Sequence, residues 1–488
     1  MLFNSIEFAF FFPIVTVLFF LTPHKLRWLL LLMASCVFYM YFKPEYILIL
    51  GFIIVVDYFV AIKIEKQETQ RQKKKWLIFS LIANLGVLFI FKYFNFVASN
   101  FNYALSLFQS TGKIAYINLI LPIGLSFHTL QAMSYTIEVS KGRFKAERHF
   151  GIYSLYVMFY PQLVAGPIER PQNLIPQFHQ KKYFNYENAR SGMILIAWGL
   201  VKKVVIADRL GPFVNQVHSM PGGYYTGIPL IISFIAAPFQ IYCDFSGYSD
   251  IATGCARIMG YNLMINFKTP VVQPNLNRFW ATWHISLTSW FRDYVYIPLR
   301  KNLFPKAGMW LSIMVVLVLS GIWHGASWNF VLWGVSNALF VIIYNIINKN
   351  KYIVSFNSHL SDFWSNKIGV LCIATSTIFF RSSDLSKAIQ IFLGMFKNVF
   401  SQIALIIKNP HGERLQYLYL KQTPTSFFLA FMFLFSLLFL ETKFINKNLD
   451  SWLVAKSKRF RWTFYYSIIL IFLLFGQFNK LDFIYFQF

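Results

Sequence analysis

The sequence is short of charge. Of its 488 residues only 13% are Asp, Glu, Lys or Arg, whereas a soluble globular domain has roughly 25%. Acidic residues are the scarcest, with 19 Asp and Glu against 45 Lys and Arg, so the formal net charge is +26. Since 57% of the chain is hydrophobic, the few charged residues cannot cover the water-exposed surface that a soluble protein of this length would have. We therefore predict a polytopic membrane protein whose outer surface contacts lipid.

Cysteine is also scarce, and the common catalytic motifs are absent. The four cysteines have no CxxC or metal-ligand spacing, so we expect no disulfide framework and read them as small buried apolar residues. There is no GxSxG elbow, P-loop or metal motif, and we predict neither a metal site nor a permanently bound cofactor. The basic residues form short runs between apolar segments. They therefore indicate membrane topology and anionic lipid headgroups, and not nucleic acid.

Apolar runs recur along the whole chain. Some are shorter than the ~20 residues that a perpendicular span needs, so tilted or re-entrant helices are expected. The longest run can hold two spans, broken around Gly321 and Gly325. We predict an all-α protein with about eleven spans plus re-entrant or in-plane helices. The runs cover residues 6–22, 26–42, 46–62, 76–94, 117–137, 150–166, 192–207, 228–243, 309–343, 367–380, 425–441 and 464–478.

The distribution of basic residues predicts the topology. The densest basic run, 63–75, is expected in the cytoplasm, which places the N-terminus outside. The apolar start lacks a basic n-region and a cleavage site, so we interpret it as a retained first span. No repeat or soluble domain is evident. We predict one integral membrane domain over 1–488, with N-terminal spans (1–110), a core (117–343) and C-terminal spans (344–488).

Two stretches place histidines among tryptophans. The first is "RFWATWHISLTSWFRDYVYIPL" at 278–299. If 277–293 is one helix, its polar residues share a face inside an aromatic wall; the alternative is an interfacial amphipathic helix. These polar residues are Asn277, His284, Thr288 and Arg292.

The second stretch is "VVLVLSGIWHGASWNFVLWG" at 315–334, in which His324 is nearly alone among apolar residues. An ionisable group within a membrane segment suggests a functional site. The glycines at GxxxG spacing, Gly321 and Gly325, allow another backbone or a substrate to approach closely. A packing motif around a hydrogen-bonded core histidine is the equal alternative.

Two further polar stretches have plainer interpretations. Asp244 and Asp250 lie in an apolar setting, and we favour ion pairs with nearby arginines over cation or proton handling. In 159–178, prolines and Gly166 exclude a regular helix through the middle. That segment is either cavity-lining backbone or an ordinary interfacial connection.

The two histidines, each preceded by a tryptophan (Trp283 and Trp323), suggest a chemistry. Imidazole can accept and return a proton near neutral pH, as acyl transfer to a hydroxyl requires. A site inside a membrane also excludes the water that would hydrolyse an activated ester. From the residues alone this indicates an embedded acyltransferase only weakly. A proton-coupled secondary transporter is the alternative of another class, although we find no repeat symmetry.

The same stretches resemble the membrane-bound O-acyltransferase (MBOAT) superfamily, and most of all its bacterial, alginate O-acetylation protein-like branch. The resemblance covers nearly the whole chain to residue 389. Its two histidine motifs carry the most specific signal. The other matching stretches are "MLFNSIEFAFFFPIV", "LPIGLSFHTLQAMSY", "PQLVAGPIERPQNLIPQF", "GLVKKVVIADRL" and "DFSGYSDIATG".

The resemblance implies a ring of tilted helices around a membrane-crossing tunnel in a bacterial cytoplasmic membrane. It implies that His324 is the general base for the acceptor hydroxyl and that His284 orients or polarises the thioester carbonyl. Arg292 and Asp293 would hold their helix by ion pairing and steer an anionic donor. Asp250, Trp283, Trp323, Asn277 and Thr288 are expected as supporting or tunnel residues.

By the same resemblance the donor is acetyl-CoA or an acyl-carrier thioester from the cytoplasm. The acceptor is an exported polysaccharide, reached directly or through a periplasmic acetyltransferase partner. O-acylation of peptidoglycan or teichoic acid is the alternative. Relatives usually have "IPLGGN" where this chain has "IPLRKN" (297–302), and basic residues where it has Ala281 and Thr282. These departures concern donor docking more than the chemistry.

Overall fold

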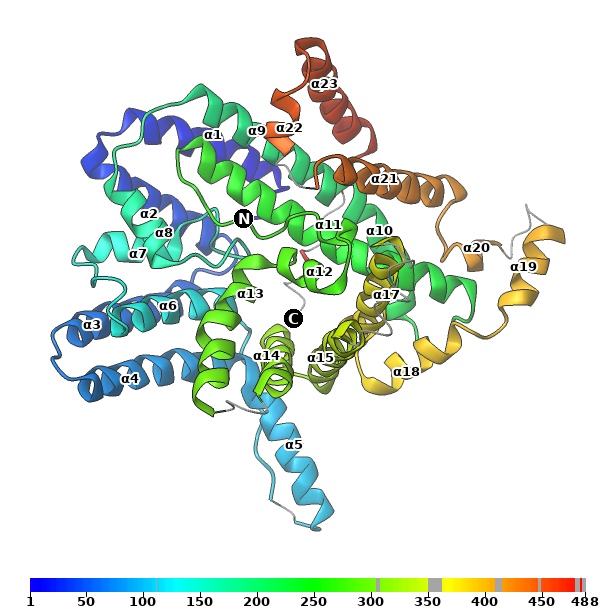
Figure 1. The fold of residues 1–488 in the computed structure, drawn as a ribbon, viewed down its shortest axis with the longest axis horizontal. Helices are drawn as coiled ribbons and strands as arrows, with labels where there is room; N and C mark the ends of the chain where they lie inside the picture. Colours follow the sequence, from blue (N-terminus) through cyan, green and yellow to red (C-terminus); the bar gives the residue numbers. More distant parts are fainter. Residues whose placement is uncertain are drawn as a thin grey trace. The chain divides into compact units, whose positions relative to one another are not determined.

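The computed structural model describes residues 1–110, 112–303, 308–349, 362–408, 415–445, 449–478 and 483–484. Within these residues every regular element is helical, as expected (Figure 1). Helices suit apolar segments, because lipid offers no partner for an open backbone group. Hydroxyl side chains cap several N-termini: Ser5 accepts from Phe8 N in α1 (Ile6–Leu21), and Thr69 accepts from Gln72 N in α4 (Gln70–Leu88).

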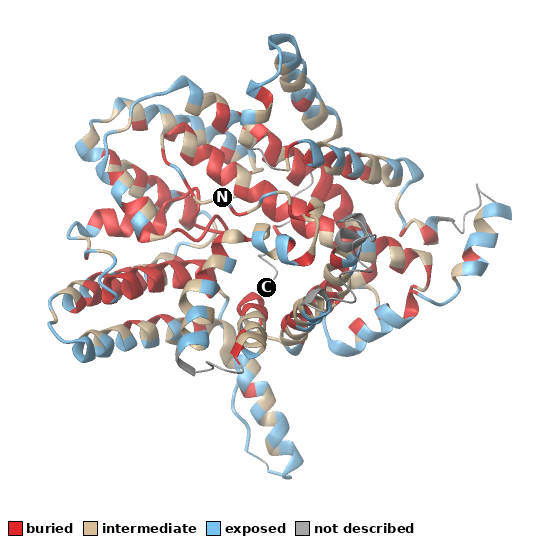
Figure 2. Ribbon diagram, viewed as in Figure 1, coloured by how far each residue is buried: buried red, intermediate tan, exposed pale blue. Residues whose placement is uncertain are grey.

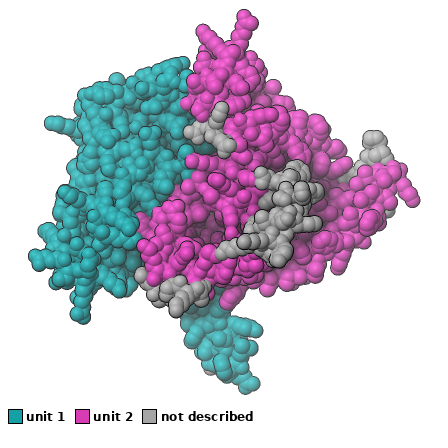
Figure 3. All heavy atoms as spheres, viewed as in Figure 1, with its two compact units in different colours: residues 1–196, 248–265 teal, residues 197–247, 266–488 magenta. Residues whose placement is uncertain are grey.

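The chain divides into two compact units. Unit 1 comprises residues 1–196 and 248–265, and unit 2 comprises 197–247 and 266–488 (Figure 3). Two of the three division points fall inside α9 (Tyr186–Leu200) and α11 (Ile228–Ile258), and the third, between residues 265 and 266, lies outside any helix. The single-domain organisation expected from the sequence stays a prediction.

Unit 1 is built around α6 (Leu125–Ser140), every residue of which is buried (Figure 2). This helix packs on α3 (Tyr46–Glu65) and α4 through a core of Ile53, Leu88, Leu125 and Ala132. A buried carboxylate, Asp57, accepts from Ser80 Oγ at 2.6 Å and from the Asn84 amide between these helices. The other helices of the unit are α1, α2 (His24–Met40), α5 (Phe94–Leu107), α7 (Phe150–Met158), α8 (Pro171–His179) and most of α9.

Unit 2 contains the two histidine motifs. Its helices are α10 (Asp208–Ser219), α12 (Leu276–Thr282), α13 (Ile285–Phe291), α14 (Gly308–His324), α15 (Trp328–Lys349), α17 (Asp362–Arg381), α18 (Leu385–Gly394), α19 (Val399–Lys408), α20 (Leu415–Leu418), α21 (Pro424–Lys443), α22 (Leu449–Val454) and α23 (Lys458–Phe475). Short π-helical segments interrupt the regular helices; one follows α9 at Val201–Ala207 and another follows α13 at Arg292–Tyr296. In the view of Figure 3 the surface of unit 2 is hollowed near its middle.

Five helices in the described part of the chain are long and apolar enough to cross a membrane. The bent pair formed by α18 and α19, which meet at 54°, would make a sixth if it forms one span. These helices agree with a multi-pass membrane protein, but they do not confirm the expected count of about eleven. The five are Tyr46–Glu65, Gln70–Leu107, Ile228–Ile258, Trp328–Ile347 and Pro424–Lys443.

The predicted break in the 309–343 run is confirmed. Helix α14 ends at His324, and α15 begins at Trp328. The two helices approach so closely that a β-carbon on Gly321 would collide with the carbonyl oxygen of Phe330. A β-carbon on Gly325 would collide with the ring of that same phenylalanine. The glycines therefore admit the neighbouring helix.

Two other runs are less helical than their composition suggests. In the 117–137 run the helix begins only at Leu125, after Gly124 in a left-handed conformation, and in the 150–166 run α7 ends at Met158. The expected absence of a regular helix through the middle of 159–178 is confirmed, since turns fill 160–166 and α8 starts at Pro171.

Candidate active site

The expectation of one continuous helix over 277–293 is wrong. Helix α12 ends at Thr282, Trp283 is extended (φ −94°, ψ 126°), and His284 is left-handed (φ 43°, ψ 53°) before α13 begins at Ile285. A left-handed residue other than glycine costs roughly 1–2 kcal/mol, so its surroundings must hold it. Asn266 does so: its carbonyl accepts from Ile285 N at 2.9 Å, and its Oδ1 accepts from Ser286 Oγ at 2.6 Å.

The imidazole of His284 lies in an aromatic box. The residue is only 1% exposed. Its ring meets the Phe245 ring edge-on, with 4.7 Å between centroids, and the rings of Phe267 and Trp323 lie at 6.2 Å and 6.1 Å. Such burial disfavours the charged form of an imidazole. The helix break therefore turns this side chain into an apolar interior.

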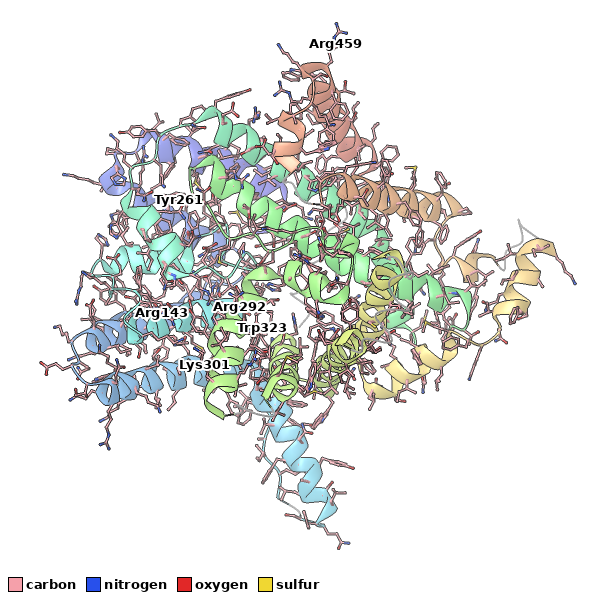
Figure 4. All side chains as sticks on the ribbon, in the orientation of Figure 1. Arg143, Tyr261, Arg292, Lys301, Trp323 and Arg459 are labelled. Carbon is pink, nitrogen blue, oxygen red and sulfur yellow. The ribbon has the colours of Figure 1, made fainter. Side chains whose placement is uncertain are left out.

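His324 is the last residue of α14 and is buried in the same way, with 6% exposure. Its ring lies 4.9 Å from Trp323, 5.1 Å from Trp333 on α15 and 5.3 Å from Phe380 on α17, all edge-on. Trp323, labelled in Figure 4, therefore contacts both imidazoles. The predicted role of this tryptophan as a supporting residue has a geometric basis.

Both histidines line one cavity of about 190 Å³. Of the predicted site residues, Trp283, Asn277, Thr288 and Arg292 also line it, although they do not share a helix. Most of the remaining lining is apolar or aromatic: Trp280, Leu287, Phe291, Tyr296, Ile313, Val316, Leu317, Ser320, Trp333 and Val341.

The polar residues that line this cavity are held by hydrogen bonds and an ion pair to neighbouring residues. The side-chain amides of Asn277 and Asn345 bond to each other between α12 and α15, at 3.0 Å and 3.3 Å. Thr288 Oγ1 donates to the carbonyl of Trp283 at 3.1 Å, across the helix break. Arg292 Nε lies 2.8 Å from Asp293 Oδ1, but both side chains are substantially exposed, so this pair adds little stability.

Asp250 belongs to unit 1, in α11, and is not among the described residues that line the cavity. Its predicted supporting role stays a prediction. Lys301, which belongs to the "IPLRKN" departure from the family pattern, follows the Arg292 segment in a short π-helical turn, Leu299–Leu303 (Figure 4).

A second, smaller cavity of about 30 Å³ adjoins the site. His324, Trp280, Trp283 and Trp333 line both cavities, so His324 stands in their common wall. The smaller cavity is completed by Pro238, Ile241, Phe279, Ile373, Ser376, Thr377 and Phe380.

The sequence did not point to Ser376 and Thr377. Hydroxyl side chains within apolar helices commonly bond back to their own backbone, so they carry little signal. Both do so here, each donating to the carbonyl of Ile373, at 2.9 Å and 2.8 Å.

The acidic residue Asp244 is ion-paired, as we favoured, but the partner type was wrong. Lys203 Nζ lies 2.8 Å from Asp244 Oδ1 and 2.8 Å from Asp208 Oδ1, and all three side chains are at most 7% exposed. A π-helical turn, Val201–Ala207, places this lysine between α10 and α11. The sequence offered nearby arginines, which is why the lysine was missed.

No metal centre is evident in the described residues, where no three His, Cys, Asp or Glu side chains gather closely enough to hold an ion. The four cysteines Cys36, Cys243, Cys255 and Cys372 are free thiols.

The described residues form a multi-pass helical membrane protein in which two buried imidazoles line one mainly apolar cavity. Residues 72–383, which include both histidines, match the MBOAT, membrane-bound O-acyltransferase family. The chain belongs to this family and is an acyltransferase.

Several relatives are similar over most of this chain. A peptidoglycan O-acetyltransferase of Helicobacter pylori is 33% identical over 398 residues, which are 75% of this chain and 73% of that protein. A probable alginate O-acetylase AlgI of Pseudomonas syringae pv. tomato is 32% identical over 400 residues, or 81% and 75% of the two chains. A teichoic acid D-alanyltransferase of Bacillus subtilis is 27% identical over 243 residues, or 48% and 61%.

Proposed function

We propose that this protein moves a short acyl group, acetyl in the first place, from a cytoplasmic thioester to a hydroxyl of an exported polysaccharide. The observation that carries the proposal is the pair of buried imidazoles, His284 and His324, on one mainly apolar cavity. Membership of an acyltransferase family favours this reaction over the proton-coupled transport that the residues alone left open.

The transfer needs one proton acceptor near the attacking oxygen. The hydroxyl oxygen bonds to the thioester carbonyl carbon while its proton passes to His324; the carbon–sulfur bond then breaks, and the thiolate takes the proton from the imidazole. His324 is buried and lines this cavity, where a positioned imidazole can take up the proton and return it during the reaction. His284 lines the same cavity and orients the carbonyl.

The walls of the cavity support transfer over hydrolysis. Aromatic and aliphatic side chains form most of the lining, so little water would compete with the acceptor. The volume of about 190 Å³ lies below the ~300–1,000 Å³ of ordinary ligand pockets, which favours acetyl over a long acyl chain. Arg292 is the charged residue of the lining and suits the anionic carrier of coenzyme A or an acyl-carrier protein.

The direction of transfer rests on charge and on the relatives. The basic run 63–75 connects the two apolar helices α3 and α4, and we assign it to the cytoplasm with the N-terminus outside. Relatives from bacteria are named for alginate and for peptidoglycan, both glycans. We therefore place the protein in the cytoplasmic membrane and assign it a glycan acceptor, reached directly or through a periplasmic acetyltransferase.

The test is transfer of radiolabelled acetyl from acetyl-CoA by the purified full-length protein in lipid nanodiscs. Label should appear as an alkali-labile ester on a glycan acceptor. His324→Ala should lower the rate by about 10²–10⁴-fold, the contribution of a positioned acid–base group. His179→Ala is the matched control, since this histidine is exposed and belongs to unit 1.

Equal rates in the two alanine variants would refute the role of His324. Label that stays on coenzyme A in the wild type, together with glycan uptake that depends on His324, would replace the enzyme proposal with the transporter. The acceptor is then identified in cells. Ester analysis of exported glycans, with and without the protein, should show acetyl groups lost from the polysaccharide, or from peptidoglycan if that is the acceptor.

A further inference from the structure

The segment that joins α8 to α9 in unit 1 carries exposed aromatic rings. It has the sequence "KKYFN" over 181–185, and α9 begins with Tyr186. Tyr183, Phe184 and Tyr186 are 69%, 63% and 67% exposed (Figure 2). Burying apolar surface is favourable, and several large exposed rings on one short stretch indicate a surface that something covers.

The backbone of this segment is attached to the body of the unit. The guanidinium of Arg27, on α2, donates to the carbonyl of Lys182. The ammonium of Lys182 lies 5.5 Å from the centre of the Tyr261 ring, which Figure 4 labels. The exposed rings therefore belong to a segment with its own fixed contacts.

The rings continue the apolar surface of α1. Phe184 meets Phe20, in the last turn of α1, edge-on with 5.7 Å between the ring centroids. The exposed residues of α1 are all apolar, as expected of a helix that contacts lipid. Phe184 therefore lies where this lipid-facing surface ends, at the level where aromatic side chains gather in membrane proteins.

Two ion pairs connect the segment to the basic run 63–75. His179, at the end of α8, pairs with Glu147 at 2.7 Å. The adjacent Arg148 pairs with Glu65, which belongs to that run. Since we assign the run to the cytoplasm, the segment lies at the cytoplasmic end of unit 1.

Two lysines at this place are not neutralised by the protein. Lys25 and Lys181 are exposed, and in the described part of the chain neither has an acidic partner. The ring of His24, next to Lys25, contacts the carbonyl of His179, two residues before Lys181. The ammonium of Lys181 lies 4.9 Å from the centre of the Tyr183 ring, so charge and aromatic surface occur together. This combination suits an anionic, partly apolar surface.

We propose that residues 181–186 anchor unit 1 in the cytoplasmic surface of the bilayer and that they bind anionic lipid there. The rings of Tyr183, Phe184 and Tyr186 insert among the headgroups, and Lys25 and Lys181 contact the headgroup phosphates. Aromatic rings suit this depth because they are apolar with a polar edge, and lysines near a membrane are attracted to its anionic lipids.

The test labels the segment with a fluorophore that brominated lipid quenches. In the full-length protein the partly exposed thiols Cys36 and Cys372 are replaced by serine, and Phe184→Cys is labelled with bimane. Reconstituted in bilayers with brominated lipid, this label should be quenched. Phe10→Cys, exposed on α1, is the control in lipid, and Glu68→Cys, exposed in the basic run, is the control in water.

The lysines are tested by comparing two brominated lipids at the Phe184→Cys label. Phosphatidylglycerol should bind there about 5- to 25-fold more tightly than phosphatidylcholine, because each nearby lysine contributes about fivefold. Lys25→Gln together with Lys181→Gln should remove this preference, and salt at about 1 M should weaken it. Lys113→Gln, an exposed lysine elsewhere in unit 1, is the matched control and should leave it unchanged.

Quenching at Phe184→Cys no stronger than at Glu68→Cys would overturn the proposal, because the rings would then lie in water. Equal binding of the two lipids would also overturn it, since the lysines would then hold no headgroup. Quenching that disappears as the protein concentration in the bilayer rises would replace lipid by a second copy of the chain. None of these measurements depends on acyl transfer, so their failure is distinct from a failure of the proposed function.

Discussion

Replacing Lys203 by Met should severely destabilise unit 2. The ammonium lies 2.8 Å from a carboxylate oxygen of Asp208 and 2.8 Å from one of Asp244, and the three side chains are 7%, 3% and 4% exposed. Asp244 also accepts from Ile484 N at 2.8 Å, so it anchors a distant part of the chain. Methionine preserves the length of the side chain but leaves two buried carboxylates without the cation they share.

The magnitude follows from this burial. Removing one partner of a buried ion pair typically costs 3–5 kcal/mol. The buried aspartates can also take up a proton once the lysine is gone. Since neutralising an Asp of ordinary pKa near 3.9 at pH 7 costs about 4 kcal/mol, this cost sets an upper limit on the free-energy penalty per carboxylate. We therefore expect Lys203→Met to lose about 3–5 kcal/mol of unfolding free energy, a large part of the ~5–15 kcal/mol that a protein has.

The measurement is thermal or denaturant unfolding of the purified protein in detergent micelles, followed by tryptophan fluorescence. Lys397→Met is the control, because that residue is exposed, and it should change the unfolding free energy by less than about 0.5 kcal/mol. Adding Asp208→Asn and Asp244→Asn to Lys203→Met should restore most of the loss. If Lys203→Met is no more destabilising than the control, the triad is not the buried ion pair that its geometry indicates.

Two further predictions concern packing and pH. Gly321→Ala should lower the free energy of unfolding by about 1–3 kcal/mol, because the new β-carbon meets the backbone of Phe330. Gly86→Ala is the control: this glycine has open space around it, so the change should be neutral or stabilising by up to ~1 kcal/mol. Thermal or denaturant unfolding of the two variants measures both effects. Burial raises the pKa of Glu169 to about 7 from an ordinary value near 4.5. Folding therefore favours its protonated form, and its contribution to stability should fall as pH rises from about 4.5 to about 7. Glu169→Gln should flatten that part of the pH profile, and an unchanged slope would contradict the assignment.

The sequence predicted the membrane class and the helical fold well, because those signals are local, whereas the roles of the two histidines stay predictions. A helix that contacts lipid needs a long run of apolar residues and few charges, and both features can be read directly from the sequence. The break between α14 and α15 was readable, because Gly321 and Gly325 mark a close helix contact. The matching family supplied the chemistry that spacing alone indicated only weakly.

What the sequence missed depends on contacts between distant residues. No local pattern announces that His284 is left-handed, since Asn266 imposes that conformation from another segment. The partner of Asp244 is a lysine some forty residues earlier in the chain, although arginines lie closer in sequence. Ser376 and Thr377 line the smaller cavity only because α17 packs against α12 and α15. The count of about eleven spans stays a prediction, because several apolar runs bend or end early in the described part of the chain.

Because the backbone at His284 is left-handed, the path of the chain at this position can be tested separately from the chemistry of the side chain. Glycine and asparagine adopt that conformation readily, whereas valine or isoleucine would strain it. A glycine there keeps the path of the chain and vacates the volume of an imidazole. Free imidazole added to the buffer then has a place to bind, and the return of activity would report what the ring contributes beyond holding the fold.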